Sequence, residues 1–135
     1  MHHPQIVVFE RDGRLAQALT TLAETERWTL RESRQVEPCL RLLRQPGPGV
    51  LVVKVVKPAE RDLALVEQAT WQMPNVPVVV VGDVEDAAVL AGLAWDVGAS
   101  YALFPPLSRD LLPEVVAGLM RSAIDKTFPV VKSSP

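Results

Sequence analysis

Short runs of consecutive apolar residues alternate along the chain with longer segments of helical periodicity. The clearest runs lie at 6–9, 50–56 and 78–81, and residues 28–30 and 101–104 are weaker strand candidates. A continuous apolar run, unlike an alternating one, is typical of a strand that is buried on both faces of a parallel sheet. We therefore expect five parallel strands at these positions.

Between the strands, apolar residues recur every three or four positions, as they do on one face of a helix. The order strand–helix, repeated five times, predicts an α/β fold with a doubly wound, five-stranded parallel (βα)5 sheet and helices on both faces. Asp110 is expected to cap the last helix, with Pro113 in its first turn. We place the domain at 1–124 and a flexible tail or linker at 125–135, where periodicity is lost.

Composition narrows the function classes. The chain has 135 residues, 14 basic and 16 acidic, and a net charge of −2, which argues against a nucleic-acid-binding protein. Its single cysteine, Cys39, excludes an intramolecular disulfide or four-thiolate metal site and is expected to be a buried thiol. No run approaches the roughly 18 apolar residues of a membrane span, and no secretion signal is evident. We therefore expect a cytoplasmic protein without a membrane partner.

The carboxyl ends of the strands are where such sheets bind ligands. The first strand is followed by FERDGRL, which matches no glycine-rich phosphate loop. The only histidines, His2 and His3, precede the first strand, so a histidine-based triad or metal site within the fold is excluded. We expect no catalytic residue, metal or cofactor, and a protein that is not an enzyme.

Four segments in order resemble the receiver domain of bacterial two-component response regulators, over residues 5–124. They are IVVFERD, VLVVKVVKP, NVPVVVVGD and VGASYALFPPL. The resemblance implies a flavodoxin-like receiver fold. It places the family's phospho-accepting aspartate at Lys54, with the proline that follows it at Pro58.

The residues that carry the family's chemistry are replaced. Glu10 keeps the first acidic position, but Arg11 stands for the second acid, Lys54 for the aspartate, Gly82 for the hydroxyl residue and Phe104 for the lysine. Lysine cannot form an acyl phosphate. Two acids, Glu10 and Asp12, are balanced by two bases, whereas a divalent cation prefers several oxygen ligands. The resemblance therefore predicts a degenerate pseudo-receiver that neither accepts phosphate nor binds Mg²⁺ tightly.

Several positions at this edge have more than one interpretation. Lys54 either forms an internal ion pair with Glu10 or Asp12, or extends its ammonium group to water. Arg11 is interpreted as a solvated or ion-paired residue, and Asp12 as a helix cap. Phe104 is expected to fill the space of the family's lysine, and its bond to Pro105 to be cis.

Tyr101 aligns with the family's switch aromatic. Without a hydroxyl at Gly82, it either stays inward, rotates freely, or is an ordinary half-buried strand residue. Trp95 is either a core residue or, with Tyr101 and Arg109, part of a protein interface.

These observations lead to two functional hypotheses. The first is a phosphorylation-independent interaction module in signal transduction, with a protein partner or a homodimer formed by the fourth helix, fifth strand and fifth helix. The alternative is a small-molecule or anion-binding module in which Arg11 and Lys54 line the vacated pocket.

Overall fold

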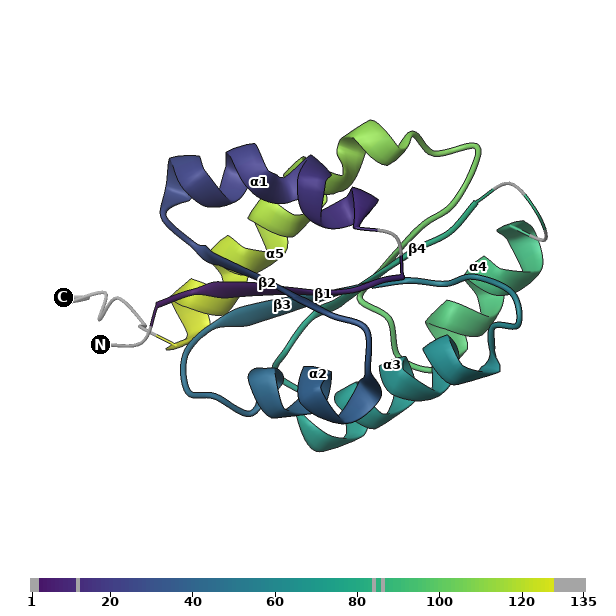
Figure 1. Ribbon diagram of the computed structural model, residues 1–135, viewed down its shortest axis with the longest axis horizontal. Coiled ribbons are helices and arrows are strands. Elements are labelled where there is room, and N and C mark those ends of the chain that lie inside the picture. The colour runs from purple at the N-terminus through teal and green to yellow at the C-terminus, as the bar shows by residue number, and fades with distance from the viewer. Residues whose placement is uncertain (1–2, 12, 84, 86, 128–135) are drawn as a thin grey trace, which may run out of the picture.

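The computed structural model describes residues 3–11, 13–83, 85 and 87–127 and contains one sheet of five parallel strands. The strand order is β2-β1-β3-β4-β5, and a helix lies between each strand and the next one along the chain (Figure 1). The predicted five-stranded parallel α/β fold is confirmed. The strands are β1 (Gln5–Phe9), β2 (Thr29–Ser33), β3 (Gly49–Lys54), β4 (Val78–Val81) and β5 (Tyr101–Leu103).

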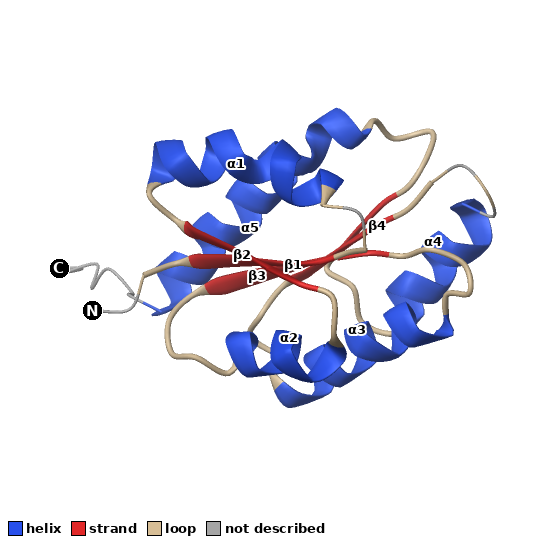
Figure 2. Cartoon of the chain, viewed as in Figure 1, coloured by secondary structure: helices blue, strands red, loops and turns tan. Residues whose placement is uncertain are grey.

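Helices cover both faces of the sheet, as Figures 1 and 2 show. Two of them, α1 (Arg14–Glu26) and α5 (Leu112–Thr127), lie on one face. The other face carries α2 (Val36–Leu43), α3 (Glu60–Gln72) and α4 (Ala87–Asp96). None of the described helices has the length and apolar character needed to cross a membrane.

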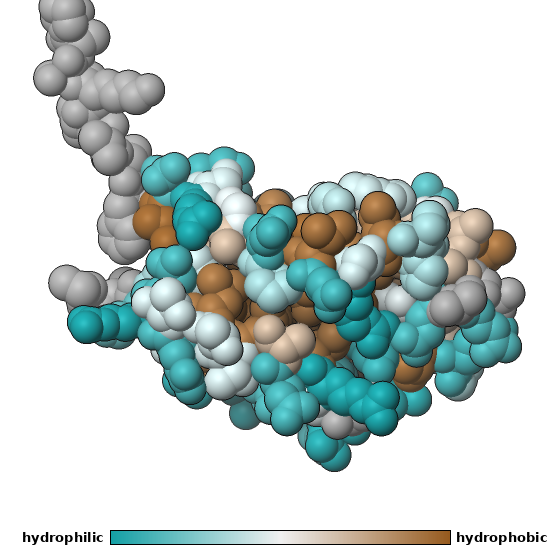
Figure 3. Space-filling model, turned by 90° about the horizontal axis from the view of Figure 1, so that it is seen from above, coloured by the Kyte–Doolittle hydropathy of each residue, from teal (hydrophilic) through white to brown (hydrophobic). Residues whose placement is uncertain are grey.

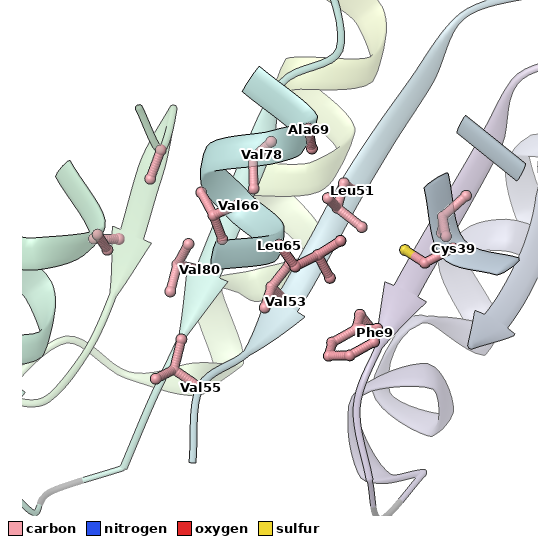
Figure 4. Close-up of a cluster of buried hydrophobic side chains, with 14 of the residues drawn as sticks. Phe9, Cys39, Leu51, Val53, Val55, Leu65, Val66, Ala69, Val78 and Val80 are labelled. Atoms are coloured by element: carbon pink, nitrogen blue, oxygen red, sulfur yellow. The ribbon is translucent and has the colours of Figure 1, made fainter. Parts of the chain in front are cut away.

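Alternate residues of each strand supply the two halves of the core. In β1, Ile6 and Val8 pack toward α1 and α5, whereas Val7 and Phe9 pack toward α2 and α3. This is the reason that the strands are apolar without interruption. Figure 4 shows the cluster on the side of α2, α3 and α4, in which Phe9 and Cys39 lie beside the strand valines. Cys39 is buried as predicted, and burial raises the pKa of its thiol to about 12.

Several element boundaries differ from the sequence-based predictions. β3 ends at Lys54, because the N–H of Val56 donates to a side chain of α3 instead of a neighbouring strand. Asp110 does not cap the last helix. A short 3-10 turn, Arg109–Leu111, precedes α5, and the hydroxyl oxygen of Ser108 accepts from the N–H of Asp110 at 3.1 Å.

The end of the last helix also differs. The predicted tail began at residue 125, where the apolar pattern stops, but α5 runs to Thr127. Backbone hydrogen bonds extend a helix beyond its last apolar residue, so periodicity underestimates its length. Residues 128–135 of the predicted tail lie outside the described part of the chain.

The face that carries α1 and α5 is mostly hydrophilic, with apolar side chains gathered along its middle (Figure 3). Half-buried residues of both helices, including Leu22 and Leu119, pack there on the core cluster of that side. Apolar contacts of α1 and α5 with the strand residues thus hold both helices on this face of the sheet.

Candidate functional site

The register of the sheet brings the predicted site positions to one edge. Phe9 is level with Val53, Lys54 with Val81, and Val81 with Leu103. The residues that follow these strands therefore meet at the carboxyl edge. They are Glu10, Arg11, Gly82 and Phe104, and they are joined there by Lys54, the last residue of β3. Asp12 lies outside the described residues, so its predicted capping role is not tested.

Glu10 serves the start of α1. It is buried, and its two carboxylate oxygens accept hydrogen bonds from the N–H groups of Leu15 and Ala16, both at 2.8 Å. Gly13, which precedes the helix, has no side chain to cap it and adopts a left-handed conformation with φ of 79°. A carboxylate from the preceding strand end thus replaces the missing cap.

Lys54 is the last residue of β3 and is buried. Whether its ammonium group reaches water stays a prediction. Because both Glu10 oxygens already bind amides of α1 and Asp12 is not described, the predicted ion pair of Lys54 stays a prediction.

Gly82 and Phe104 fit each other closely. Phe104 is buried, and a Cβ placed on Gly82 would lie 2.0 Å from Cε2 of the Phe104 ring. The ring therefore occupies the space that any side chain at position 82 would need. The predicted cis bond before Pro105 is wrong: the cis bond is the next one, Pro105–Pro106. Each of these adjacent bonds precedes a proline, whose tertiary amide weakens the preference for trans, so sequence does not distinguish them.

Asp62, which the sequence analysis missed, lies at the same edge. Its side chain is only 1% exposed, and Oδ2 accepts a hydrogen bond from the N–H of Val56 at 3.0 Å. Oδ1 has no hydrogen-bond partner but lies 3.8 Å from Nη2 of Arg11. Burial raises the pKa of Asp62, while the Val56 bond and the charges of Arg11 and Arg61 oppose the shift.

A signal for Asp62 was present in the sequence. Asp62 precedes Val66 by four positions and Ala69 by seven, which places it on the buried face of α3. An acidic residue on that face needs partners. The structure places Arg11 beside it, and because the Arg11 side chain is also 45% exposed, it is both ion-paired and solvated.

Arg109 faces the end of β4. Its Nη2 donates to the carbonyl oxygen of Gly82 at 3.3 Å and pairs with the Asp83 carboxylate. This contact links the turn before α5 to the exit of β4. Arg109, which is also predicted to be an interface residue, therefore stabilises the loops at this edge.

Trp95 and Tyr101 lie together on α4 and β5. Their ring centroids are 6.4 Å apart in an edge-to-face arrangement with an interplanar angle of 60°. Trp95 is 51% exposed, which contradicts the interpretation as a core residue. Tyr101 is half-buried, with its ring held against Trp95.

The described residues do not fit a Mg²⁺ ion of the kind that the resemblance implies. They contain no group of three or more acidic, histidine or cysteine side chains that could hold a metal. At the edge itself, both oxygens of Glu10 are engaged by helix amides, Lys54 brings a positive charge, and Gly82 offers no side-chain oxygen. No chemical step is therefore assigned to a metal here.

Comparison with known proteins finds similar structures but no similar sequences. No protein-family model and no curated protein sequence matches the chain. The receiver domain of the Francisella response regulator 1452 matches with a TM-score of 0.70 and 22% identity, over 89% of this chain and 98% of that one. The receiver domain of NtrX from Brucella abortus matches with a TM-score of 0.69 and 20% identity, over 87% and 98%. The chain has the receiver-domain fold.

A third similar structure is a dimer of receiver domains. The beryllofluoride-activated NtrC4 receiver domain dimer matches with a TM-score of 0.69 and 14% identity, over 88% of this chain and 98% of that one. At such identities the likeness establishes the fold alone, and the function of this receiver fold must be argued from its own residues.

Proposed function

We propose that this receiver fold is a pseudo-receiver: a phosphorylation-independent protein–protein interaction module in bacterial signal transduction. One observation carries the proposal. The Phe104 ring fills the space at Gly82, beside a β3 strand that ends in Lys54 rather than in a carboxylate. Among the described residues, the end of β3 therefore offers a phosphoryl group no carboxylate to accept it, and the ring takes up the space beside it at Gly82.

The surrounding contacts support an inert site. Glu10 and Asp62 accept hydrogen bonds from backbone N–H groups, and Arg11 and Arg109 pair with carboxylates. These groups stabilise the local structure. No nucleophile paired with a base is present among them, so the proposal includes that the chain is not an enzyme.

The interaction surface of the proposal is the face formed by α4, β5 and α5. Trp95 is half-exposed against Tyr101, and a large amphipathic ring of this kind is a frequent anchor of protein interfaces. The NtrC4 receiver domain with this fold is a dimer. We assign the same kind of assembly, a homodimer or a complex with a protein partner, to this face.

The alternative function, anion binding by Arg11 and Lys54, has weaker support. Arg11 is directed to the buried carboxylate of Asp62, and Lys54 is buried at the end of its strand. An incoming anion would have to compete with Asp62 for Arg11. No observation at the described residues favours such a ligand over the internal pair.

Light scattering after size-exclusion chromatography tests the interaction surface. We expect the mass of the wild-type protein to rise with concentration, and Trp95→Ala to return it to the monomer, because the substitution removes the exposed anchor. Trp71→Ala is the matched control, since Trp71 is 81% exposed on α3, outside the proposed face. A wild-type monomer at every concentration, or equal masses for wild type and Trp95→Ala, would contradict the homodimer.

A further inference from the structure

Helix α4 is apolar on its solvent side as well as on its buried side. No charged residue occurs from Ala87 to Trp95, and Asp96 is the first. Leu90 and Ala94 are buried against the core, yet Val89 is 64% exposed and Leu93 is 42% exposed. A helix that is apolar all round is normally covered on all sides, so this one lacks a partner in the monomer.

Leu93, the exposed leucine of α4, lines a groove. An open cavity of about 560 Å³ lies between α4 and the start of α3. Its apolar lining consists of Pro58, Ala59, Leu63, Leu90 and Leu93. We call it the α3–α4 groove.

This groove is separate from the face that carries Trp95. Residues two positions apart on a helix point about 200° apart, so Leu93 and Trp95 lie on opposite sides of α4. Trp95 contacts Tyr101 of β5, whereas Leu93 lines the groove beside α3. A partner can occupy one surface without covering the other.

The rim of the groove is acidic. Glu60, which lines the groove, is exposed on α3 and forms no ion pair with another residue that the structure describes. Lys57, the basic residue of the lining, is paired with Glu85 at 3.4 Å. Two carboxylates, those of Glu60 and Glu85, thus share one ammonium group at the groove, and a partner with basic residues beside its apolar face would complement them.

We propose that the α3–α4 groove binds an amphipathic helix of a protein partner, with leucine-like side chains on one face and lysine or arginine along its edges. A helix fits because both walls are helices, whose side-chain ridges accept a third helix between them. The proposal rests on the interaction role of the chain, but not on its indifference to phosphorylation.

Two synthetic peptides of 14 residues test the proposal. Both carry leucine at heptad positions a, d and e, and the remaining positions are lysine and alanine in one peptide and glutamate and alanine in the other. Each is titrated into the ¹⁵N-labelled protein while amide shifts are followed by NMR. We expect the lysine peptide alone to bind, with shift changes in α3 and α4 around Leu63 and Leu93.

Leu93→Asp provides the test variant, and Leu107→Asp is its matched control, because Leu107 is similarly exposed at 45% but lies outside the groove. We expect Leu93→Asp to weaken binding at least about tenfold, as for an interface anchor, and Leu107→Asp to leave it unchanged. Leu63→Ala, which shortens another side chain of the groove lining, serves as a second variant if Leu93→Asp unfolds the domain. Glu60→Gln should weaken binding and reduce its dependence on salt, because Glu60 lines the groove.

Four outcomes would overturn the proposal: no binding of the lysine peptide, equal binding of both peptides, shift changes centred on Trp95 and Tyr101, or equal affinity of wild type and Leu93→Asp. A concentration-dependent dimer that Leu93→Asp abolishes would assign the groove to a second copy, and would overturn it too. A response to beryllofluoride would contradict the pseudo-receiver proposal and leave the peptide result intact, so the two failures can be told apart.

Discussion

Gly82 and Phe104 are best understood as a matched pair. The absence of a Cβ at Gly82 lets the Phe104 ring lie against the end of β4, and the ring in turn leaves no room for a hydroxyl-bearing residue. Two replacements that look independent in the sequence therefore depend on each other in the structure. Under the pseudo-receiver proposal, packing as well as charge would therefore keep a phosphoryl group out of this edge.

Gly82→Ala should destabilise the domain. Its new methyl group would meet the Phe104 ring at 2.0 Å, and relieving such overpacking typically costs about 1–3 kcal/mol. Urea unfolding measures the loss. The control is Gly92→Ala in α4, where an added Cβ would meet no atom within 4 Å apart from the helix's own backbone and the two adjoining residues. Replacing this helical glycine should stabilise the domain by up to about 1 kcal/mol. Equal effects of the two substitutions would contradict the proposed packing.

Asp62 is a second residue whose role depends on its surroundings. Burial raises the pKa of its carboxyl, although the Val56 bond and the charge of Arg11 work in the opposite direction. The native state then binds the proton more tightly than the unfolded chain does. Stability from this group is therefore fully present below the ordinary pKa of 3.8 and is lost as pH rises through the folded-state pKa.

Asp62→Asn isolates this effect, because an amide oxygen can still accept from the N–H of Val56. We expect the free energy of unfolding of the wild type, relative to that of Asp62→Asn, to fall as pH rises above 3.8. Urea unfolding at a series of pH values gives both quantities. A difference that grows with pH would mean that Arg11 outweighs burial and that the pKa is lowered.

The start of α1 depends on Glu10 rather than on a residue of the helix itself. Replacing it by alanine leaves the N–H groups of Leu15 and Ala16 without their acceptors. We expect Glu10→Ala to cost about 1–2 kcal/mol in urea unfolding and to speed amide exchange at these two residues. Glu24→Ala, at an exposed position of the same helix, should change stability by less than about 0.5 kcal/mol. Similar losses in both variants would contradict the capping role.

The strands and helices were predictable because each depends mainly on its own pattern. A parallel strand covered by helices on both faces must be apolar throughout, and 78–81 showed this directly. Boundaries were less predictable where another element decides them. β3 ends where Asp62 takes the N–H of Val56, and Ser108 replaces Asp110 as the cap before α5.

The candidate site could be predicted only in part. Alignment with the family's motif identified Lys54, Gly82 and Phe104, because these positions follow strand ends. The contacts Arg11–Asp62 and Arg109–Asp83 join residues more than 20 positions apart, and no local pattern indicates them. Sequence thus identified which groups are missing from the site, and structure was needed to show what replaces them.

In the molecule as a whole, the carboxyl edge of the sheet is separate from two exposed surfaces around α4. At the carboxyl edge, buried carboxylates and their partners fix the loops. Around α4, the face with Trp95 and the α3–α4 groove remain open to partners. If the pseudo-receiver proposal holds, these surfaces act constitutively, since nothing at the edge is available to switch them.

Beryllofluoride, which mimics a phosphoryl group, provides the most direct test of phosphorylation independence. ¹H–¹⁵N spectra of the protein are recorded before and after addition of Mg²⁺ and beryllofluoride, with the NtrC4 receiver domain, which beryllofluoride activates, as the positive control. We predict identical spectra for this protein, because Lys54 and the Phe104 ring occupy the site. Shifts of the amides around Lys54 and Gly82 that saturate with beryllofluoride would contradict the account.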